Sequence, residues 1–332
     1  MAVKHRKMTL SGQRKKWVEG RDATLRGEPV RLNPRTAEQY ADEVVKMVRA
    51  MHLDISSQVE KLFAKPVAKA AVQKTEVISM DGLPEYMRKK MSGVGIKTSR
   101  DWLVTIDGVA NDESISSMAV ALTDKLADKW IKRFASFGDS WTKRMMTKAT
   151  ELSAKDLGRS MEKLSGGLTI DTNQLSDKTK DKMIASADQA SSLIKSIAPQ
   201  YTSSVKEAVS RSIVDSSSSF SQLQQTIHDS LQDKYKSHKN KAFNVAKDQM
   251  RKSYTAITEG RMKDLGVGDY IWRHAGGSVN PRDYHLNVLN GQKFSLDNPP
   301  VIDPKTGVKG KPGDLPFCSC YMEPVISFDK KG

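Results

Sequence analysis

The chain has 332 residues, of which 38% are hydrophobic, and a mean hydropathy of −0.54 that is polar for a compact globule. Its 54 lysines and arginines outnumber its 39 aspartates and glutamates, and the net charge of +15 makes a polyanion such as nucleic acid the expected partner. No segment approaches the ~18 consecutive apolar residues of a membrane span, and polar MTLSGQ stands where a signal peptide would be apolar, so we expect neither a membrane partner nor export.

Residues 1–34 are predicted to form a basic N-terminal arm. They hold nine basic and three acidic side chains without a sustained apolar period, which is typical of an arm that is disordered or docked on a partner. Phosphate contacts from such an arm would bind DNA without sequence preference. The plainer alternative is that the charge only keeps a helical protein soluble. The candidate DNA-contacting residues are Lys4, Arg6, Lys7, Arg14, Lys15 and Lys16.

Residues 35–214 are predicted to form a helical body. At its start, the Thr36 hydroxyl and the Gln39 amide fit a capping box, which satisfies the free N–H groups of a first helical turn. Apolar side chains then recur every three or four residues over 40–63, and again over 115–145, which predicts two long amphipathic helices. Stripes rich in methionine and aromatic residues indicate helix–helix packing rather than a cofactor site.

Shorter features complete this body. The apolar run 102–106 predicts one strand, and Ser165-Gly166-Gly167 breaks the helical pattern. Helical spacing resumes at Met183 and stops before Pro199, whose ring disfavours helical backbone in the preceding residue. A short helix is expected over residues 201–209.

A C-terminal domain is predicted over residues 215–332. Its serine run at 215–219 is a linker, and helical segments follow at 220–235 and 243–257. Gly266 can end the second segment in the left-handed conformation. The predicted fold class is therefore mainly α, with an elongated helical body and a small irregular α+β C-terminal module.

The loop-rich tail of this domain, residues 269–326, concentrates metal-ligand chemistry. Both cysteines, two of the six histidines and seven of the twelve prolines lie in it. Residues 270–274 predict a strand, and Asn290-Gly291 favours a tight hairpin turn. A unit of this size with few large apolar side chains needs a staple or a surface on which to pack.

Zinc is one such staple, because thiolates and neutral imidazoles suit a closed tetrahedral site. Its binding would contribute on the order of 10 kcal/mol of folding free energy. The C-x-C spacing strains a disulfide, which favours folding in a reducing cytoplasm. The alternative is that both cysteines are small buried hydrophobes and both histidines are packing residues. The candidate zinc ligands are His274, His285, Cys318 and Cys320.

A metal-dependent nuclease is a further alternative, because His274, Asp283, His285 and Asn290 lie in a Gly-rich segment. Their order and spacing do not reproduce a histidine-asparagine-histidine arrangement, and the third histidine is missing. Nothing elsewhere fits an acyl-transfer triad, a phosphate-cradling glycine loop or a paired-carboxylate site. The sequence therefore predicts no catalytic residue.

The tail resembles the Mu F-like minor head proteins of tailed bacteriophages, also called head morphogenesis proteins. Its motifs occur in the order W-x-H-x-G-G-x-x-x-P-R-x-x-H-x-x-x-x-N-G-x-x-F, then D-x-P-P, G-x-P-G and C-x-C-x-x-x-P-V. The close resemblance covers about residues 200–330. The family commonly has arginine where Ser319 stands, and many members have a C-x-x-C pair near Arg282 and His285. The residues that match, besides the four candidate zinc ligands, are Trp272, Gly276, Gly277, Pro281, Arg282, Asn290, Gly291, Phe294, Pro299, Pro300, Pro312, Gly313 and Pro324.

The resemblance implies a structural role rather than catalysis. It implies a minor capsid protein present in a few copies in the virion interior, made in the host cytoplasm and packaged with double-stranded DNA, with which it could also be ejected. The implied partners are the portal protein and the major capsid or scaffolding protein, and residues 215–332 would be the head morphogenesis domain. A DNA-packaging protein that is not part of a virion is the first alternative, and the nuclease is the second.

Overall fold

A computed structural model describes most of the chain. The six candidate DNA-contacting residues of the N-terminal arm lie outside the described residues, as does most of the predicted serine linker. The described residues are 23–64, 96–98, 104–106, 115–215, 220–276 and 281–328.

The fold is mainly α-helical with a small module of short antiparallel strands, which confirms the predicted class. The described helices are α2 (Pro34–Ala64), α4 (Ile115–Leu164), α5 (Asp177–Lys195), α6 (Ile197–Asp215) and α7 (Phe220–Asp264). The predicted stripes form their buried faces, because side chains three and four residues apart share one side of a helix. Among the described residues, no helix combines the length and apolarity needed to cross a bilayer.

Helix α2 begins three residues earlier than the capping-box prediction. The Asn33 side chain, not that of Thr36, accepts a hydrogen bond from the Arg35 backbone N–H at 2.9 Å. Pro34 then occupies the first helical position, where its missing N–H costs nothing and its fixed φ is already helical. Asparagine is a strong N-cap residue, so the correction follows from the same capping chemistry.

Two predicted helix ends are confirmed by glycines in the left-handed region. Helix α4 ends before Gly166 and Gly167, whose φ angles are +75° and +109°. Helix α7 ends before Gly266, whose φ is +73°, and the Val267 N–H bonds back to the Met262 carbonyl. The two segments predicted at 220–235 and 243–257 are one continuous helix, since no proline or glycine separates them.

The chain forms two compact units, and α2, α4 and α7 each contribute residues to both. The first unit comprises Met1–Val45, Ala135–Lys195 and Lys241–Gly332. The second comprises Lys46–Phe134 and Ser196–Asn240.

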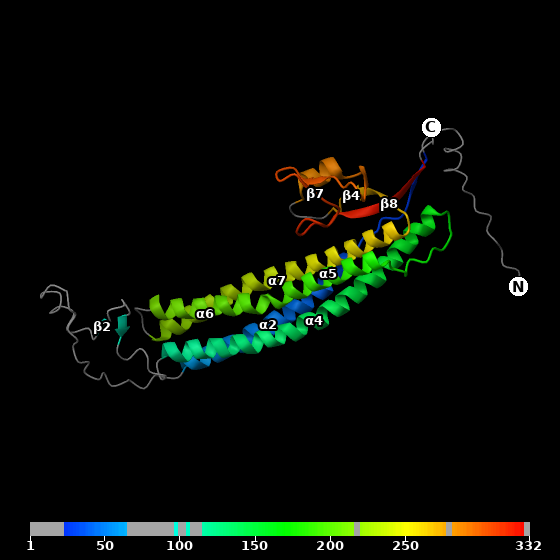
Figure 1. Ribbon diagram of the computed structural model, residues 1–332. Helices are drawn as coiled ribbons and strands as arrows, with labels where there is room; N and C mark the ends of the chain where they lie inside the picture. The colour runs from blue at the N-terminus through cyan, green and yellow to red at the C-terminus, as the bar shows by residue number, and fades with distance from the viewer. Residues whose placement is uncertain are drawn as a thin grey trace, which may run out of the picture. The chain divides into compact units, whose positions relative to one another are not determined.

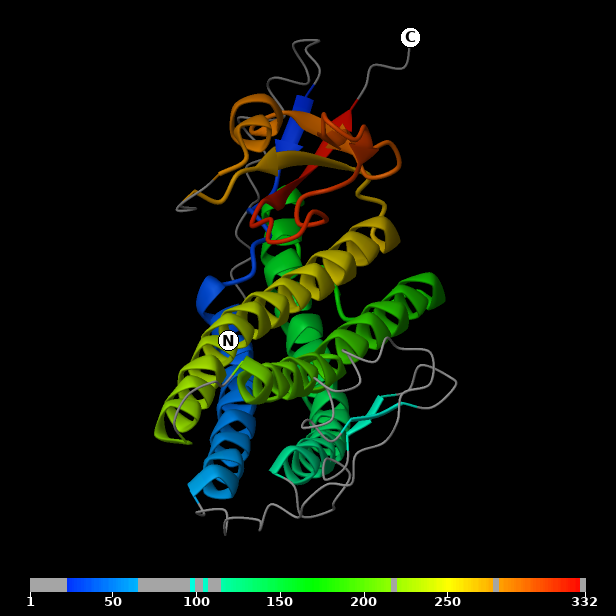
Figure 2. The same cartoon turned by 90° about the vertical axis from the view of Figure 1, so that its left-hand side faces the viewer.

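The tail module of the first unit is built on a four-stranded antiparallel sheet. Its order is β1 (Ala23–Arg26), β8 (Tyr321–Phe328), β4 (Asp269–Arg273) and β5 (Lys293–Ser295). Figures 1 and 2 both show this sheet over the C-terminal part of α7. Strand β4 confirms the predicted strand, and its Tyr270, which is fully buried, contributes to the core of the module.

Strand β1 corrects the prediction of a basic arm over residues 1–34. Residues 23–26 pair with β8, and the Val30 N–H continues the ladder to the Met322 carbonyl at 2.9 Å. Leu25, Val30 and Leu32 are the large apolar residues of the segment 23–32, and charged residues stand between them. This apolar pattern is too short to indicate a strand. The edge of a distant sheet determines its structure.

Three smaller elements complete the described strands and turns. Strands β2 (Ile96–Thr98) and β3 (Val104–Ile106) form a hairpin, and β3 coincides with part of the strand predicted at 102–106. Strands β6 (Val301–Asp303) and β7 (Val308–Lys309) form a second. Asn290-Gly291 does not form a two-residue hairpin. With Asn290 at φ −61°, ψ 126° and Gly291 at φ +85°, it forms a type II turn that precedes β5.

The second unit has an aromatic core with a buried histidine. The Nδ1 atom of His52 lies 2.8 Å from the Tyr201 hydroxyl, and its ring stacks on Tyr235 at 4.3 Å. His228 lies 2.9 Å from a Glu60 carboxylate oxygen. Both histidines are therefore satisfied packing or surface residues.

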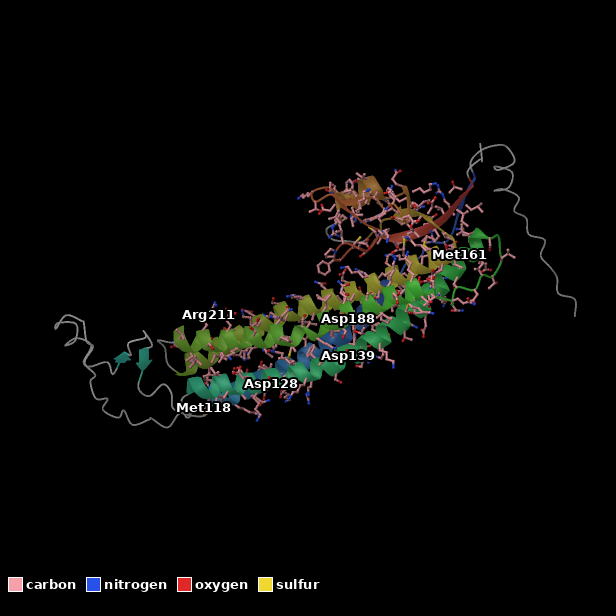
Figure 3. All side chains as sticks on the ribbon, in the orientation of Figure 1. Met118, Asp128, Asp139, Met161, Asp188 and Arg211 are labelled. Carbon is pink, nitrogen blue, oxygen red and sulfur yellow. The ribbon has the colours of Figure 1, made fainter. Side chains whose placement is uncertain are left out.

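Exposed ion pairs connect helices of the first unit. Asp139 of α4, labelled in Figure 3, accepts hydrogen bonds from Ser191 and Lys195 of α5 at 2.9 and 2.6 Å. Such exposed pairs each contribute little, about 0–1 kcal/mol.

Glu259 of α7 is a more consequential pair, because its carboxylate is only 7% exposed. It accepts contacts from Lys311 of the tail at 2.7 Å, Lys182 of α5 at 3.2 Å and Lys263 at 3.7 Å. Burial alone raises the pKa of Glu259, but the hydrogen bonds and charges of Lys311 and Lys182 outweigh it and hold the pKa below its usual 4.5.

We expect Glu259→Gln to lower the free energy of unfolding at pH 7 by about 1–3 kcal/mol, because the variant replaces charge-assisted bonds by neutral ones. A folded-state pKa below 4.5 stabilises the fold above that pH, and this contribution disappears as the pH falls through the folded-state value. Urea unfolding of both proteins at several pH values should show the difference shrinking below pH 4.5. The control Glu151→Gln, in an exposed pair with Lys148, should change stability by less than about 0.5 kcal/mol.

Candidate metal centre

Three potential metal ligands meet in the core of the tail module. His285 lies in η1, a short π-helix (Tyr284–Leu289), and Cys318 and Cys320 lie in the segment that leads into β8. All three side chains are buried, and their ligand atoms lie within 4.8 Å of one another. Among the described residues, no other group of three or more histidine, cysteine or acidic residues has its ligand atoms so close together.

Hydrogen bonding orients the His285 ring toward the two sulfurs. Its Nε2 donates to the backbone carbonyl of Ile302 at 2.9 Å, so Nδ1 carries the lone pair in the neutral ring. Nδ1 lies 3.6 Å from Cys318 Sγ and 3.7 Å from Cys320 Sγ. Zinc–sulfur and zinc–nitrogen bonds at a tetrahedral angle would separate these atoms by about 3.5–3.6 Å. Both nitrogen–sulfur separations therefore fit a tetrahedral metal ion held by His285 and the two cysteines.

The two thiols hold their protons unequally. A hydrogen bond from the Cys320 thiol lowers the pKa of Cys318 well below its usual value, against the opposing effect of burial. The backbone N–H groups of Cys320 and Gly313 act in the same direction. The same shared proton raises the pKa of Cys320. The pair thus resembles a thiolate and a thiol, and a cation would replace the remaining proton.

His274 is separate from the other predicted ligands, which corrects the predicted set of four. Its Nδ1 accepts a hydrogen bond from the Gly276 N–H at 3.1 Å, and its own backbone N–H donates to the Asn290 side chain at 2.9 Å. His274 lies in the loop directly after β4, whereas His285 lies in η1 and is buried. A fourth ligand would come from solvent or from another group.

Several motif residues pack around this centre. Trp272 of β4 is fully buried, and its ring meets His285 edge-to-face with centroids 5.1 Å apart. Phe294 of β5 packs edge-to-face on Trp272 at 6.4 Å. Gly291 takes its positive φ so that its N–H reaches the Trp272 carbonyl at 2.8 Å. The predicted motif thus forms one wall of the metal centre.

Other motif residues fix the segment that carries the cysteines. Arg282 donates to the Pro316 carbonyl at 2.8 Å, two residues before Cys318. Pro312 and Gly313 are buried, and Gly313 has a φ of +94°. A Cβ atom there would come within 3.1 Å of Thr255 Oγ1 of α7, so glycine permits the close approach of the tail to the helix. Pro281 is exposed and has no such contact in the described structure.

The groups that sequence reasoning missed here are mostly main-chain groups. The Ile302 carbonyl fixes the His285 ring, and backbone N–H groups of Cys320 and Gly313 support the Cys318 sulfur. Such groups carry no residue-type signal, so no sequence pattern could have identified them. Asp248 of α7 accepts a hydrogen bond from the Phe317 N–H at 2.7 Å. It lies far from Phe317 in sequence, so no local pattern indicates this contact either.

The residues of the nuclease alternative have structural contacts. Both ring nitrogens of His285 are engaged, and the ring is 2% exposed. Asn290 serves the His274 backbone, and Asp283 precedes η1 without a side-chain capping bond. This arrangement leaves His285 no access to a bulky phosphodiester.

Comparison with known proteins gives limited information. No family model and no solved structure matches the chain. A similar protein from Haemophilus influenzae, itself described only as uncharacterised, is 31% identical over 134 residues. The match covers 40% of this chain and 27% of that protein, so the chain spans about a quarter of its relative's length. The similarity does not place the chain in a family.

Proposed function

We propose that the chain is a minor head protein of a tailed bacteriophage whose tail module is stapled by a structural zinc ion. The protein would sit in the capsid interior beside the portal, contact the major capsid or scaffolding protein through helical faces, and accompany the packaged double-stranded DNA. The proposal assigns the tail a role in assembly and no bond-making chemistry.

The observation that carries the proposal is the convergence of the head-morphogenesis motif on one buried centre. Residues selected only by their resemblance to that family contact the metal triad or the segment that carries the cysteines, as Trp272 and Arg282 do, or support such a residue, as Gly291 does through the Trp272 carbonyl. Each contact positions backbone or fills the core. Motif residues whose contacts stabilise the fold support the assignment of a structural protein better than that of an enzyme.

Zinc is the metal that the ligand chemistry favours. Two thiolates and one imidazole suit zinc better than magnesium or calcium, which prefer oxygen ligands. The ligands would be His285, Cys318 and Cys320, and the bound ion would cross-link η1 to the segment before β8. In a module whose strands have two to eight residues, such a cross-link would contribute much of the folding free energy.

Purified virions test the head assignment. Particles produced from the genome that encodes the chain should contain it at a few copies each, measured by quantitative mass spectrometry against the major capsid protein. Genomes that carry Cys318→Ser should yield particles that lack the protein or few particles, whereas His274→Ala should leave its incorporation near normal. Recovery of the protein only from infected-cell lysate, with normal particles lacking it, would contradict the assignment.

A further inference from the structure

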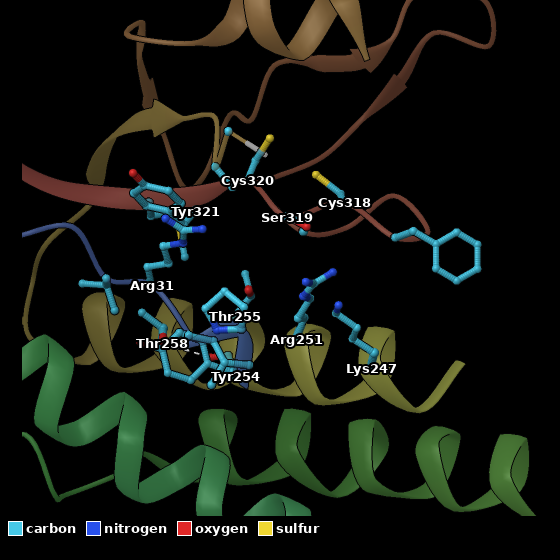
Figure 4. A pocket seen from close by; sticks show the side chains of 18 of the residues that line it. Arg31, Lys247, Arg251, Tyr254, Thr255, Thr258, Cys318, Ser319, Cys320 and Tyr321 are labelled. Atoms are coloured by element: carbon cyan, nitrogen blue, oxygen red, sulfur yellow. Dashed lines mark hydrogen bonds between the residues drawn. The ribbon is translucent and has the colours of Figure 1, made fainter. Parts of the chain in front are cut away.

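A cationic cleft lies on the opposite side of the cysteine segment from the metal centre. It has a volume of about 610 Å³ and is enclosed by α7, the residues before α2 and the segment from Phe317 to Met322. Figure 4 shows Arg251 and Lys247 rising from α7 toward Cys318 and Ser319, whereas the two cysteine sulfurs point away from the helix. All of these elements belong to the first unit.

The cleft carries more positive charge than its own residues neutralise. Its charged lining consists of Arg31, Lys247 and Arg251 against the Glu38 carboxylate and the Cys318 sulfur, three positive groups to two negative ones. Lys247 is paired with Glu38 at 2.6 Å. In the described structure neither Arg31 nor Arg251 has a carboxylate within ion-pair distance, and Arg31 instead lies 5.3 Å over the Tyr321 ring. Two guanidinium groups are thus available to an incoming anion.

Arg251 is held where an anion would interact with it strongly. The side chain is half-buried in the cleft wall, and this burial lowers the pKa of its guanidinium despite the opposing charges of Asp248 and Glu38. Charge–charge attraction strengthens as water is excluded. A guanidinium offers up to five donors in a planar fork, which matches the oxygen atoms of a phosphate group.

The rim of the cleft adds an aromatic ring. Phe317 lines the cleft and is 56% exposed. Its φ is +60°, and no other non-glycine residue in the described part of the chain has a positive φ. Its N–H donates a hydrogen bond to the Asp248 carboxylate at 2.7 Å, and this bond helps to keep the strained backbone in place. An exposed aromatic ring in a cleft that is also lined by guanidinium groups is a combination with which proteins bind single-stranded nucleic acids.

We propose that this cleft binds a nucleotide unit of a single-stranded nucleic acid, with a phosphate on Arg31 and Arg251 and a base against Phe317. The volume suits one or two nucleotides and not a duplex, whose width would keep its phosphates at the rim. An acidic peptide would use the arginines but not the exposed ring. The site includes none of the six candidate DNA-contacting residues of the N-terminal arm and does not depend on the proposed role in the phage head.

Fluorescence anisotropy with a labelled five-nucleotide oligothymidylate and the full chain tests the site. Arg31→Gln combined with Arg251→Gln should weaken binding by at least tenfold and reduce the slope of log affinity against log salt by about 0.7, since the two arginines together neutralise one phosphate. Phe317→Ala should weaken binding by about tenfold through lost stacking. Arg31→Gln alone should weaken it severalfold, and because Arg31 is exposed this variant keeps the fold.

Two controls make the result specific. Arg49→Gln removes the same charge from an exposed position on α2 and should leave affinity unchanged. Neutralising the six lysines and arginines of the N-terminal arm should weaken duplex binding but retain the effect of the cleft variants on the pentamer. Unchanged pentamer affinity in the double-arginine variant would overturn the proposal. So would competition by inorganic pyrophosphate that matches the pentamer mole for mole, since it would identify a free phosphate as the ligand.

Discussion

Cys318→Ser is expected to reduce the zinc content of the purified protein from one ion per chain to below about a tenth. Two ligands remain, and the serine hydroxyl is a far weaker zinc ligand than a thiolate. Because binding of structural zinc contributes on the order of 10 kcal/mol, the loss should unfold the tail module while the helices stay folded. Elemental analysis gives the stoichiometry, and near-ultraviolet circular dichroism of Trp272 reports the packing around His285.

His274→Ala is the matched control for this result. His274 lies in the same tail and in the same motif, but its ring nitrogen bonds to Gly276 and it stands apart from the triad. Its zinc content should remain at one ion per chain. Loss of zinc in this variant, or absence of zinc from the wild-type protein after metal-replete purification, would contradict the three-ligand site.

Trp272→Ala should lower the free energy of unfolding of the tail module by about 3–5 kcal/mol, the usual cost of removing a fully buried tryptophan. The ring packs on both His285 and Phe294, so its removal opens a cavity beside the metal centre. Trp272→Phe should cost less than half as much, because it keeps most of the apolar contacts of the ring.

Chemical denaturation followed by tail-specific hydrogen exchange measures this effect. Val288→Ala is the control, because Val288 lies in η1 three residues after His285 but is 50% exposed. Its expected cost is below about 0.5 kcal/mol. Equal destabilisation by Trp272→Ala and Val288→Ala would show that Trp272 does not support the centre.

The helical body was predictable because its signals are local. The stripe over 40–63 needs only its own spacing to indicate a helix, and Gly266 needs only its own φ to end one. The predicted break before Pro199 falls at Ser196, between α5 and α6, and Pro199 lies in the first turn of α6, where its ring is tolerated.

The candidate metal centre was predictable in composition but not in membership. Residue type identified His274 and His285 equally well, and only the fold separates them: η1 turns His285 into the core, while His274 follows the end of β4. The cationic cleft was not predictable at all. Arg31, Lys247 and Arg251 come from two distant segments of the chain and read locally as ordinary charged surface residues.

The place of β1 at the margin of the sheet restricts how the basic N-terminal arm can be removed. A deletion that stops at residue 22 leaves the four strands intact. One that continues toward Pro34 strips β8 of its outer neighbour and uncovers a row of unpaired N–H and C=O groups. An extended peptide could then add itself as a replacement strand, so an over-trimmed protein would present the eight-residue edge of β8 in place of the four-residue edge of β1.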